Sequence, residues 1–186
     1  MDHRERERGP GHRLLRVWLA VGVVLSTAWS ATGRESPASG NRITPEVQRE
    51  LLTLPFYTVF DNLTFRIEGD TVTLLGQVTR AALKSDAENA VRRIEGVARV
   101  NNQIEVLPLS ASDGRMRLAE YLAIYGDAGL SQYATRSAPP IHIVVKSGNV
   151  TLEGTVDGKY DKNLAFSQAS SVPGVASVTD HLRVSP

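Results

Sequence analysis

Histidine and carboxylate side chains are the groups of this 186-residue sequence most able to do chemistry, because it has 4 histidines, 20 acidic residues and no cysteine. The lack of cysteine excludes a thiolate nucleophile, a disulfide and a cysteine-ligated zinc site. His3 and His12 lie in the charged N-terminal stretch, whereas His142 and His181 fall out of phase with the apolar residues of two expected strands. We therefore expect His142 and His181 on the solvent face of a sheet.

No residue pattern typical of an active site accompanies these histidines. The sequence has no Ser-His-Asp order, no glycine-rich phosphate loop and no repeated carboxylate pair. Asp157, Asp161 and Asp180 are scattered, and turns or helix caps explain them. The net charge of +1 gives no reason to expect a polyanionic partner. We predict no catalytic residue, no metal site, no cofactor and no small-molecule substrate.

The elements that would position any site occur twice, 78 residues apart. Residues 65–106 and 143–184 align without a gap and share 12 identities in 42 positions. Glycines and branched apolar residues dominate the shared positions, which indicates a duplicated structural unit. The identical residues of the first copy are Val72, Thr73, Leu74, Gly76, Val78, Lys84, Ala87, Gly96, Val97, Ala98, Val100 and Val106.

Each copy predicts a hairpin, a helix and a third strand. In the first copy, two alternating runs flank Gly69-Asp70, as in a hairpin with a tight turn. Residues 81–95 place apolar side chains on one helical face, and residues 97–106 read as a strand. With a helix before each hairpin, the expected fold is α+β. It consists of two copies of an αββαβ sandwich, each a three-stranded mixed sheet with helices on one face.

The helices that precede the hairpins have different signatures. The first is expected to begin at Thr44-Pro45-Glu46, which offers a cap residue, a proline at the first helical position and an early acid. The second spans residues 115–125, with Leu118, Leu122 and Tyr125 along one side.

Four repeated glycines have expected structural roles. Gly76 and Gly154 lie at inward strand positions, where a missing side chain lets another backbone or a helix approach closely. Gly96 and Gly174 follow the expected helices and suit a helix-ending left-handed conformation.

Composition divides the chain into five segments. A basic start, a short apolar core from Val17 and small residues at Ser26, Ala28 and Ser30 are typical of a secretory signal peptide. The alternatives are an uncleaved N-terminal membrane anchor and plain disorder. The segments are a signal peptide (1–30), a flexible spacer (31–42), a first domain (43–107), a linker (108–114) and a second domain (115–186). We accordingly expect a periplasmic or secreted protein.

Residues 54–60 form the most aromatic stretch of the chain. Phe56, Tyr57 and Phe60, beside Arg66, could contact lipid, because aromatic side chains favour the membrane interface. The same rings could instead fill the core between the first helix and the sheet. The sequence leaves both possibilities open.

The repeated residues carry a resemblance to a known family. Residues 72–78 and 96–106, with their second-copy partners, follow the pattern VxLxGxV … GVxxVxNxIxV, and Thr179-Asp180 departs from it. The chain thus resembles the tandem BON (bacterial OsmY and nodulation) domain proteins over residues 43–186. The resemblance implies an αββαβ fold, a cell-envelope location, phospholipid binding, a link to osmotic stress and no enzymatic activity. Its strand order would place a strand between His142 and His181, about 9–10 Å apart, so a shared metal is not expected.

Together these observations predict an exported, non-enzymatic binding module of the cell envelope. It would interact with phospholipid membrane surfaces and support envelope integrity. The alternative is a periplasmic protein-protein adaptor or chaperone-like factor that uses edge strands or the groove between the copies. Nucleic acid is not an expected partner, because the outward sheet face lacks both aromatic stacking residues and a basic excess.

Overall fold

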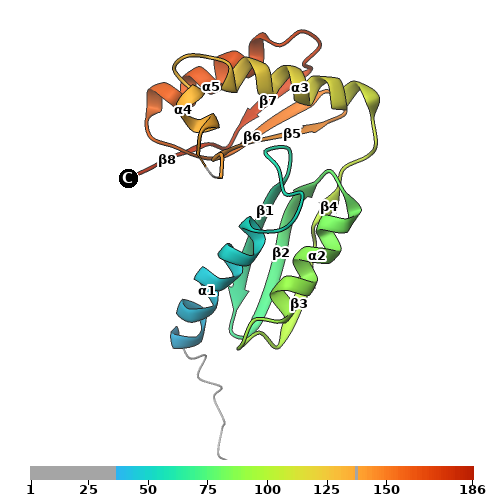
Figure 1. The fold of residues 1–186 in the computed structure, drawn as a ribbon, viewed down its shortest axis with the longest axis vertical. Coiled ribbons are helices and arrows are strands. Elements are labelled where there is room, and N and C mark those ends of the chain that lie inside the picture. Colours follow the sequence, from blue (N-terminus) through green and yellow to red (C-terminus); the bar gives the residue numbers. More distant parts are fainter. Residues whose placement is uncertain (1–36, 137) are drawn as a thin grey trace, which may run out of the picture. The chain divides into compact units, whose positions relative to one another are not determined.

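The computed structural model describes residues 37–136 and 138–186, with side chains from residue 42 onward. These residues belong to one compact unit, Glu35–Pro186. The expected signal peptide, residues 1–30, lies outside the described residues. The described part is α+β, with two mixed sheets that each pack against helices (Figure 1).

The first repeat contains one sheet and two helices. The order of its strands is β1-β2-β3, and β4 continues along β2 where β3 ends. Strand β1 is antiparallel to β2, whereas β3 and β4 are parallel to it. The elements are α1 (Pro37–Leu52), β1 (Asn62–Glu68), β2 (Thr71–Val78), α2 (Ala81–Arg92), β3 (Arg99–Asn102) and β4 (Glu105–Val106).

The second repeat has the same topology, with sheet order β5-β6-β7 and β8 beside β6. Its strands β6, β7 and β8 lie 78 residues after β2, β3 and β4, so the expected repeat and fold are confirmed. A short helix is added between its first helix and its hairpin. The elements are α3 (Ala111–Tyr125), α4 (Ser131–Ala134), β5 (Ile141–Lys146), β6 (Asn149–Val156), α5 (Lys159–Ser171), β7 (Ser177–Asp180) and β8 (Arg183–Val184).

The third strand of each repeat is broken in two, which the sequence did not indicate. In the first repeat, the Asn102 side chain accepts a hydrogen bond from the Ile104 N–H and donates to the Lys84 carbonyl of α2. In the second, Asp180 accepts from the Leu182 N–H in the same way. The break turns Ile104 and Leu182 into their cores, where each is almost fully buried.

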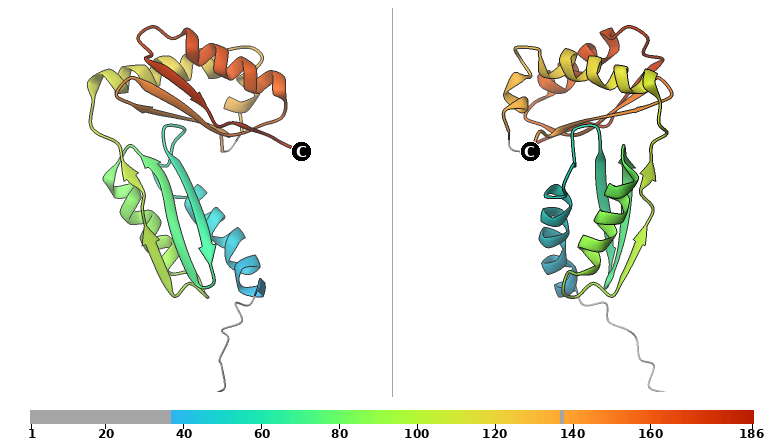
Figure 2. Two further views of the ribbon diagram at one scale, coloured as in Figure 1. Left: turned by 180° about the vertical axis from the view of Figure 1, so that it is seen from behind. Right: turned by 45° about the vertical axis from the view of Figure 1, so that its right-hand side comes forward.

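Each repeat has its own hydrophobic core between its sheet and its helices. In α1, Ile43, Val47 and Leu51 recur every four residues and are all buried. Figure 2 shows α3 and α5 side by side on one face of the second sheet. The expected arrangement of helices on one face of each sheet therefore holds.

Both leading helices begin earlier than expected. Helix α1 starts at Pro37, inside the stretch expected to be a spacer, and Pro45 lies within it rather than at its start. The turn before Pro45 gains packing, because Ile43 is buried against Gly96. Helix α3 starts at Ala111, where the Ser110 hydroxyl accepts a hydrogen bond from the Asp113 N–H.

The repeated glycines serve close strand contacts and turns. A Cβ atom at Gly76 would lie 2.0 Å from the Asn62 carbonyl oxygen, and one at Gly154 would lie 1.9 Å from that of Pro140. Gly96 does not cap α2, which ends at Arg92. It stands instead at φ +91° in a turn closed by the Val97 N–H and the Ile94 carbonyl. Gly174 occupies the same turn position in the second repeat, at φ +89°.

Candidate functional site

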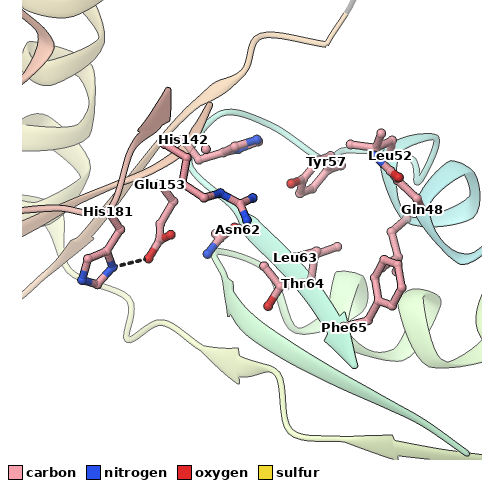
Figure 3. A pocket seen from close by; sticks show the side chains of 13 residues that line it. Gln48, Leu52, Tyr57, Asn62, Leu63, Thr64, Phe65, His142, Glu153 and His181 are labelled. Carbon is pink, nitrogen blue, oxygen red and sulfur yellow. Dashed lines mark hydrogen bonds and ion pairs between the residues drawn. The ribbon is translucent and has the colours of Figure 1, made fainter. Parts of the chain in front are cut away.

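A groove of about 650 Å³ lies beside α1 and β1 in the described residues. One wall comes from α1 and the segment that follows it, the floor from β1, and the far end from the second sheet (Figure 3). The groove mixes apolar and polar side chains. It is lined by Gln48, Leu51, Leu52, Tyr57, Asn62, Leu63, Thr64, Phe65, His142, Glu153, Gly154, His181 and Arg183.

The two histidines of the second repeat lie on either side of Glu153 at the end of this groove. Glu153 on β6 lies between them, opposite His142 in the strand register and hydrogen-bonded to Nδ1 of His181 at 2.7 Å. His142 packs its ring against that of Tyr57, with centroids 5.5 Å apart. Its buried Nδ1 has no hydrogen-bond partner among the described residues, and burial lowers its pKa. No three His, Cys, Asp or Glu side chains within residues 37–136 and 138–186 gather as a metal site would require.

The aromatic segment 57–60 joins the two repeats. The Val59 carbonyl accepts a hydrogen bond from the Ile143 N–H of β5 at 2.7 Å. The Phe60 ring meets Tyr121 of α3 edge-on, with centroids 6.2 Å apart. Val59 and Phe60 pack on the second core, and Tyr57 packs on the first. Tyr57 thus packs on the first core, as one sequence alternative expected, whereas Phe60 packs on the second core at the contact between repeats, which neither alternative described.

Asp61 fixes this segment in place. Its fully buried carboxylate accepts hydrogen bonds from the N–H groups and hydroxyls of Thr58 and Thr79, at 2.6 to 3.0 Å. The carboxylate therefore ties the segment to the end of β2. Asp61 is not among the site residues predicted from the sequence. The Thr-x-x-Asp spacing of a local turn was the available signal.

The other two expected lipid-contact residues remain exposed. Phe56 is 68% exposed and has φ +66°, an uncommon conformation for a bulky residue. The Arg80 guanidinium lies over its ring, 5.0 Å from the centroid. Arg66 is exposed on β1, with Glu68 as its ion-pair neighbour at 4.0 Å. The structure therefore splits the expected set into two exposed and two half-buried side chains.

The outer face of α3 and α5 is a site that the sequence analysis missed. Leu118 and Leu122, expected along one side of the helix with Tyr125, point outward and are 57% and 61% exposed. On α5, Tyr160 and Phe166 are also exposed. We call these four exposed side chains, which two neighbouring helices carry, the outer apolar face, although Tyr160 and Phe166 point about 120° apart around α5. An exposed Arg115 and an exposed Lys159 lie on the same two helices.

No acidic side chain is exposed on α3 or α5, because all their acids have inward roles. Asp113 accepts hydrogen bonds from the Ser147 and Gly148 N–H groups of the β5–β6 turn, at 2.9 and 3.0 Å. Asp161 accepts one from the Tyr133 hydroxyl at 2.5 Å. Glu120 is fully buried, its two carboxylate oxygens have no hydrogen-bond partner among the described residues, and burial raises its pKa to about 7. The same rotation of α3 turns Asp113 toward the β5–β6 turn and the two leucines outward.

Comparisons with known proteins identify both repeats. Residues 41–108 and 129–186 match the BON domain family. A 125-residue region, 66% of this chain, is 29% identical to Osmotically-inducible protein Y of Escherichia coli K12 and covers 61% of that protein. Two solved structures of CdsD, a structural protein of the type III secretion system of Chlamydia trachomatis, are also similar. They share 14% identity and cover 77% and 78% of this chain and 98% and 93% of their own, with TM-scores of 0.28 and 0.27.

In the part of the chain that the structure describes, no helix has the length and apolar character needed to cross a bilayer.

Proposed function

Because the chain belongs to the BON domain family and carries two copies of the domain, we propose that it is an exported, non-enzymatic module that binds phospholipid surfaces at the cell envelope. In this role it supports envelope integrity. Its relative in Escherichia coli is named as osmotically inducible, and we propose a similar link to osmotic stress. Export is supported by the basic start, apolar core and small residues of segment 1–30.

The observation that carries the membrane proposal is the outer apolar face on α3 and α5. Aliphatic and aromatic side chains with a few basic residues and no acids suit the interface of an anionic bilayer. Leu118 and Leu122 lie one helical turn apart, so both can enter the same lipid surface. Arg115 lies on the same exposed side, where a guanidinium can meet a phosphate. We expect moderate affinity, because residues 31–186 lack the cluster of roughly four to eight basic residues found in strong anionic-lipid binders.

Phe56 is a second, smaller contact that we propose for lipid. Its ring is exposed and bears the Arg80 guanidinium, whereas Tyr57 and Phe60 are held at the contact between repeats. A single aromatic ring at an interface contributes less than a face of four side chains. We therefore assign the main membrane contact to the second repeat.

Flotation with phosphatidylglycerol-containing vesicles tests this function. The purified protein is expected to float with the vesicles, and a Leu118→Glu/Leu122→Glu double variant is expected to stay at the bottom. Leu52→Glu, at an exposed position of α1, is the matched control and should float like the parent. Phe56→Ser should reduce flotation only slightly. Flotation of the double variant at the parental level would reject the assigned face, and failure of the parent to float would reject the membrane function.

Cell fractionation tests the export part of the proposal. The protein is expected in the periplasmic or secreted fraction, with residues 1–30 removed. A full-length chain that fractionates with the membrane would favour the uncleaved anchor, and a cytoplasmic chain would contradict export.

One observation favours a second candidate function, that of a protein adaptor. Strand β1 is an edge strand, and its residues Asn62, Leu63, Thr64 and Phe65 line the groove beside it. Unpaired edges bind other extended chains. This edge is the subject of the inference below.

A further inference from the structure

The edge strands β1 and β5 differ in whether another segment of the chain contacts their outer edge. Strand β5, at the edge of the second sheet, is covered by the segment 57–60, whose Val59 carbonyl accepts the Ile143 N–H. By the 78-residue repeat, the position equivalent to Ile143 on β1 is Phe65. No other segment of the described chain covers β1 there. One edge is thus contacted through a single main-chain hydrogen bond to a turn, and the other edge is left open.

The main chain of β1 is available for pairing. Residues of an antiparallel strand alternate between facing their partner and facing away. Because Ile143 faces away from β6, its equivalent Phe65 faces away from β2, and Ile67 does the same two residues later. Within residues 37–136 and 138–186, no hydrogen bond reaches the outward N–H or C=O of Phe65 or Ile67. Leu63, at the inner end, is already hydrogen-bonded to the Tyr57 hydroxyl.

The side chains along this edge also lack cover. Leu63, Phe65 and Ile67 are only partly buried in the first core, whereas their equivalents in the second repeat are fully buried. The equivalents are Ile141, Ile143 and Val145. An occupant between β1 and α1 would bury the remaining apolar surface, including that of Leu52, which is 44% exposed.

We propose that the groove between α1 and β1 binds an extended segment of another polypeptide, which adds to the first sheet as a strand beside β1. The site does not depend on the membrane contact and gives the adaptor function a defined location. The occupant would carry alternating apolar side chains toward Leu52 and Phe65, whereas Val59 and Phe60 contact the second core from consecutive positions of a turn.

The position and charge of the groove narrow this assignment. The groove is continuous with the contact between the repeats, because Tyr57 and His142 take part in both. At that end Arg183 is exposed and has no ion pair among the described residues, whereas Glu153 is bound by His181. An acidic residue at this end of the bound segment would neutralise Arg183. We therefore expect an extended apolar segment with an acid at one end.

A peptide that copies residues 54–61 of this chain is a suitable probe. It reproduces the segment that covers β5 and ends in an acid, and β5 is already occupied in the intact protein. Titration of ¹⁵N-labelled protein should shift the amide signals of Phe65 and Ile67 most. A peptide N-methylated at alternate residues cannot pair through its main chain and should bind at least about tenfold more weakly.

Reciprocal variants separate this proposal from the membrane function. Leu52→Glu places a charge on the wall of the groove at an exposed position, so it should fold and weaken peptide binding about tenfold. Leu122→Glu should leave peptide binding unchanged while it reduces vesicle binding. Arg183→Gln should weaken the peptide about threefold.

Four results would overturn the proposal. The first is the absence of amide shifts at about millimolar peptide, a concentration at which weak strand addition is still detected. The second is a set of shifts centred on α3 and α5. The others are equal binding of the N-methylated peptide and unchanged peptide binding by the Leu52→Glu variant. None of these bears on vesicle flotation, so the two functions fail separately.

Discussion

The two repeats share one fold but present different surfaces. On the second repeat, the helices α3 and α5 expose four large apolar side chains and no acid. On the first repeat, the exposed positions of α1 include Arg42, Glu46 and Arg49, and Arg92 is exposed at the end of α2. The 78-residue repeat maps Ala82 to Tyr160 and Glu88 to Phe166. Duplication thus preserved the buried positions and left the solvent face of the helices free to diverge.

The edge strands also differ, but here the first repeat is the one with the uncovered surface. The second repeat has its edge covered by segment 57–60, and the first has an open groove. Each repeat therefore offers one surface that the other lacks, and we propose that the helical face binds lipid and the strand edge binds peptide. The division of function between the repeats is the central claim of this account, and the following changes test it.

Close packing of the strands should be equally necessary in both repeats. Gly154→Ala and Gly76→Ala each place a Cβ within about 2 Å of a carbonyl oxygen. Each should lower the free energy of unfolding by about 3 kcal/mol, because the strands must separate and φ is positive. Gly114→Ala, in α3 with open space around it, should instead raise stability by about 0.5 kcal/mol. Urea denaturation measures all three, and a mild effect at only one of the two strand glycines would contradict equal packing.

Glu120 should make stability depend on pH through the second repeat alone. Its pKa is raised from 4.5 to about 7 in the folded state, so the folded protein holds a proton that the unfolded chain releases between these values. Stability is therefore full below pH 4.5 and falls as pH rises through about 7. Glu120→Gln should gain about 2 kcal/mol at pH 8 and little at pH 4. Urea denaturation at both pH values measures the gain. Glu50→Gln on α1 is the control, and a parental profile in Glu120→Gln would reject this account.

His142 should act with the opposite sign at the contact between repeats. Burial lowers its pKa below 6.5, so the unfolded chain binds the proton more readily. Stability is full above pH 6.5 and falls as pH drops through the lowered pKa. In a Glu120→Gln background, which removes the larger effect, His142→Phe should flatten this acid limb and keep a ring beside Tyr57. His181→Gln should leave the limb in place, and thermal unfolding between pH 5 and 7 measures the difference.

Charge should make the smallest contribution to the surface difference. Arg115→Gln should weaken vesicle binding about fivefold, since one basic residue near an anionic surface is worth about 1 kcal/mol. Arg49→Gln on α1 should have no effect, because α1 is assigned no membrane contact. Sedimentation with phosphatidylglycerol vesicles compares the two, and equal losses would remove the distinction between the repeats.

The fold could be predicted well from the sequence, because the residues shared by both repeats are those that the fold requires. Strands β2, β3 and β4 recur at a fixed offset, and a gapless match preserves both turn glycines and inward residues. The rotation of α3 could not be predicted in the same way. Leu118, Leu122 and Ile124 are all apolar, so the sequence allows either side of α3 to face the core. In the structure Ile124 is buried and Asp113 accepts a hydrogen bond from the Ser147 N–H, and both leucines are exposed. A buried acid such as Glu120 looks like a surface residue in a sequence.

The contact between repeats was also beyond the sequence. Phe56, Tyr57 and Phe60 lie close together in the chain but have different environments. Phe56 is exposed, Tyr57 packs on the first core and Phe60 packs on the second. Their separation depends on the positive φ of Phe56 and on the buried Asp61 carboxylate. The aromatic composition therefore indicated that this segment makes contacts, but it did not indicate that the second repeat is a partner in those contacts.

The most direct test follows leucine methyl signals of the protein with lipid nanodiscs that contain phosphatidylglycerol and a gadolinium-bearing lipid. Gadolinium broadens the signals of nuclei close to the bilayer. The account predicts that Leu118 and Leu122 broaden first, while Leu52, on the open groove of the first repeat, stays sharp. Broadening of Leu52 with sharp signals from Leu118 and Leu122 would contradict the assignment of the membrane contact to the second repeat.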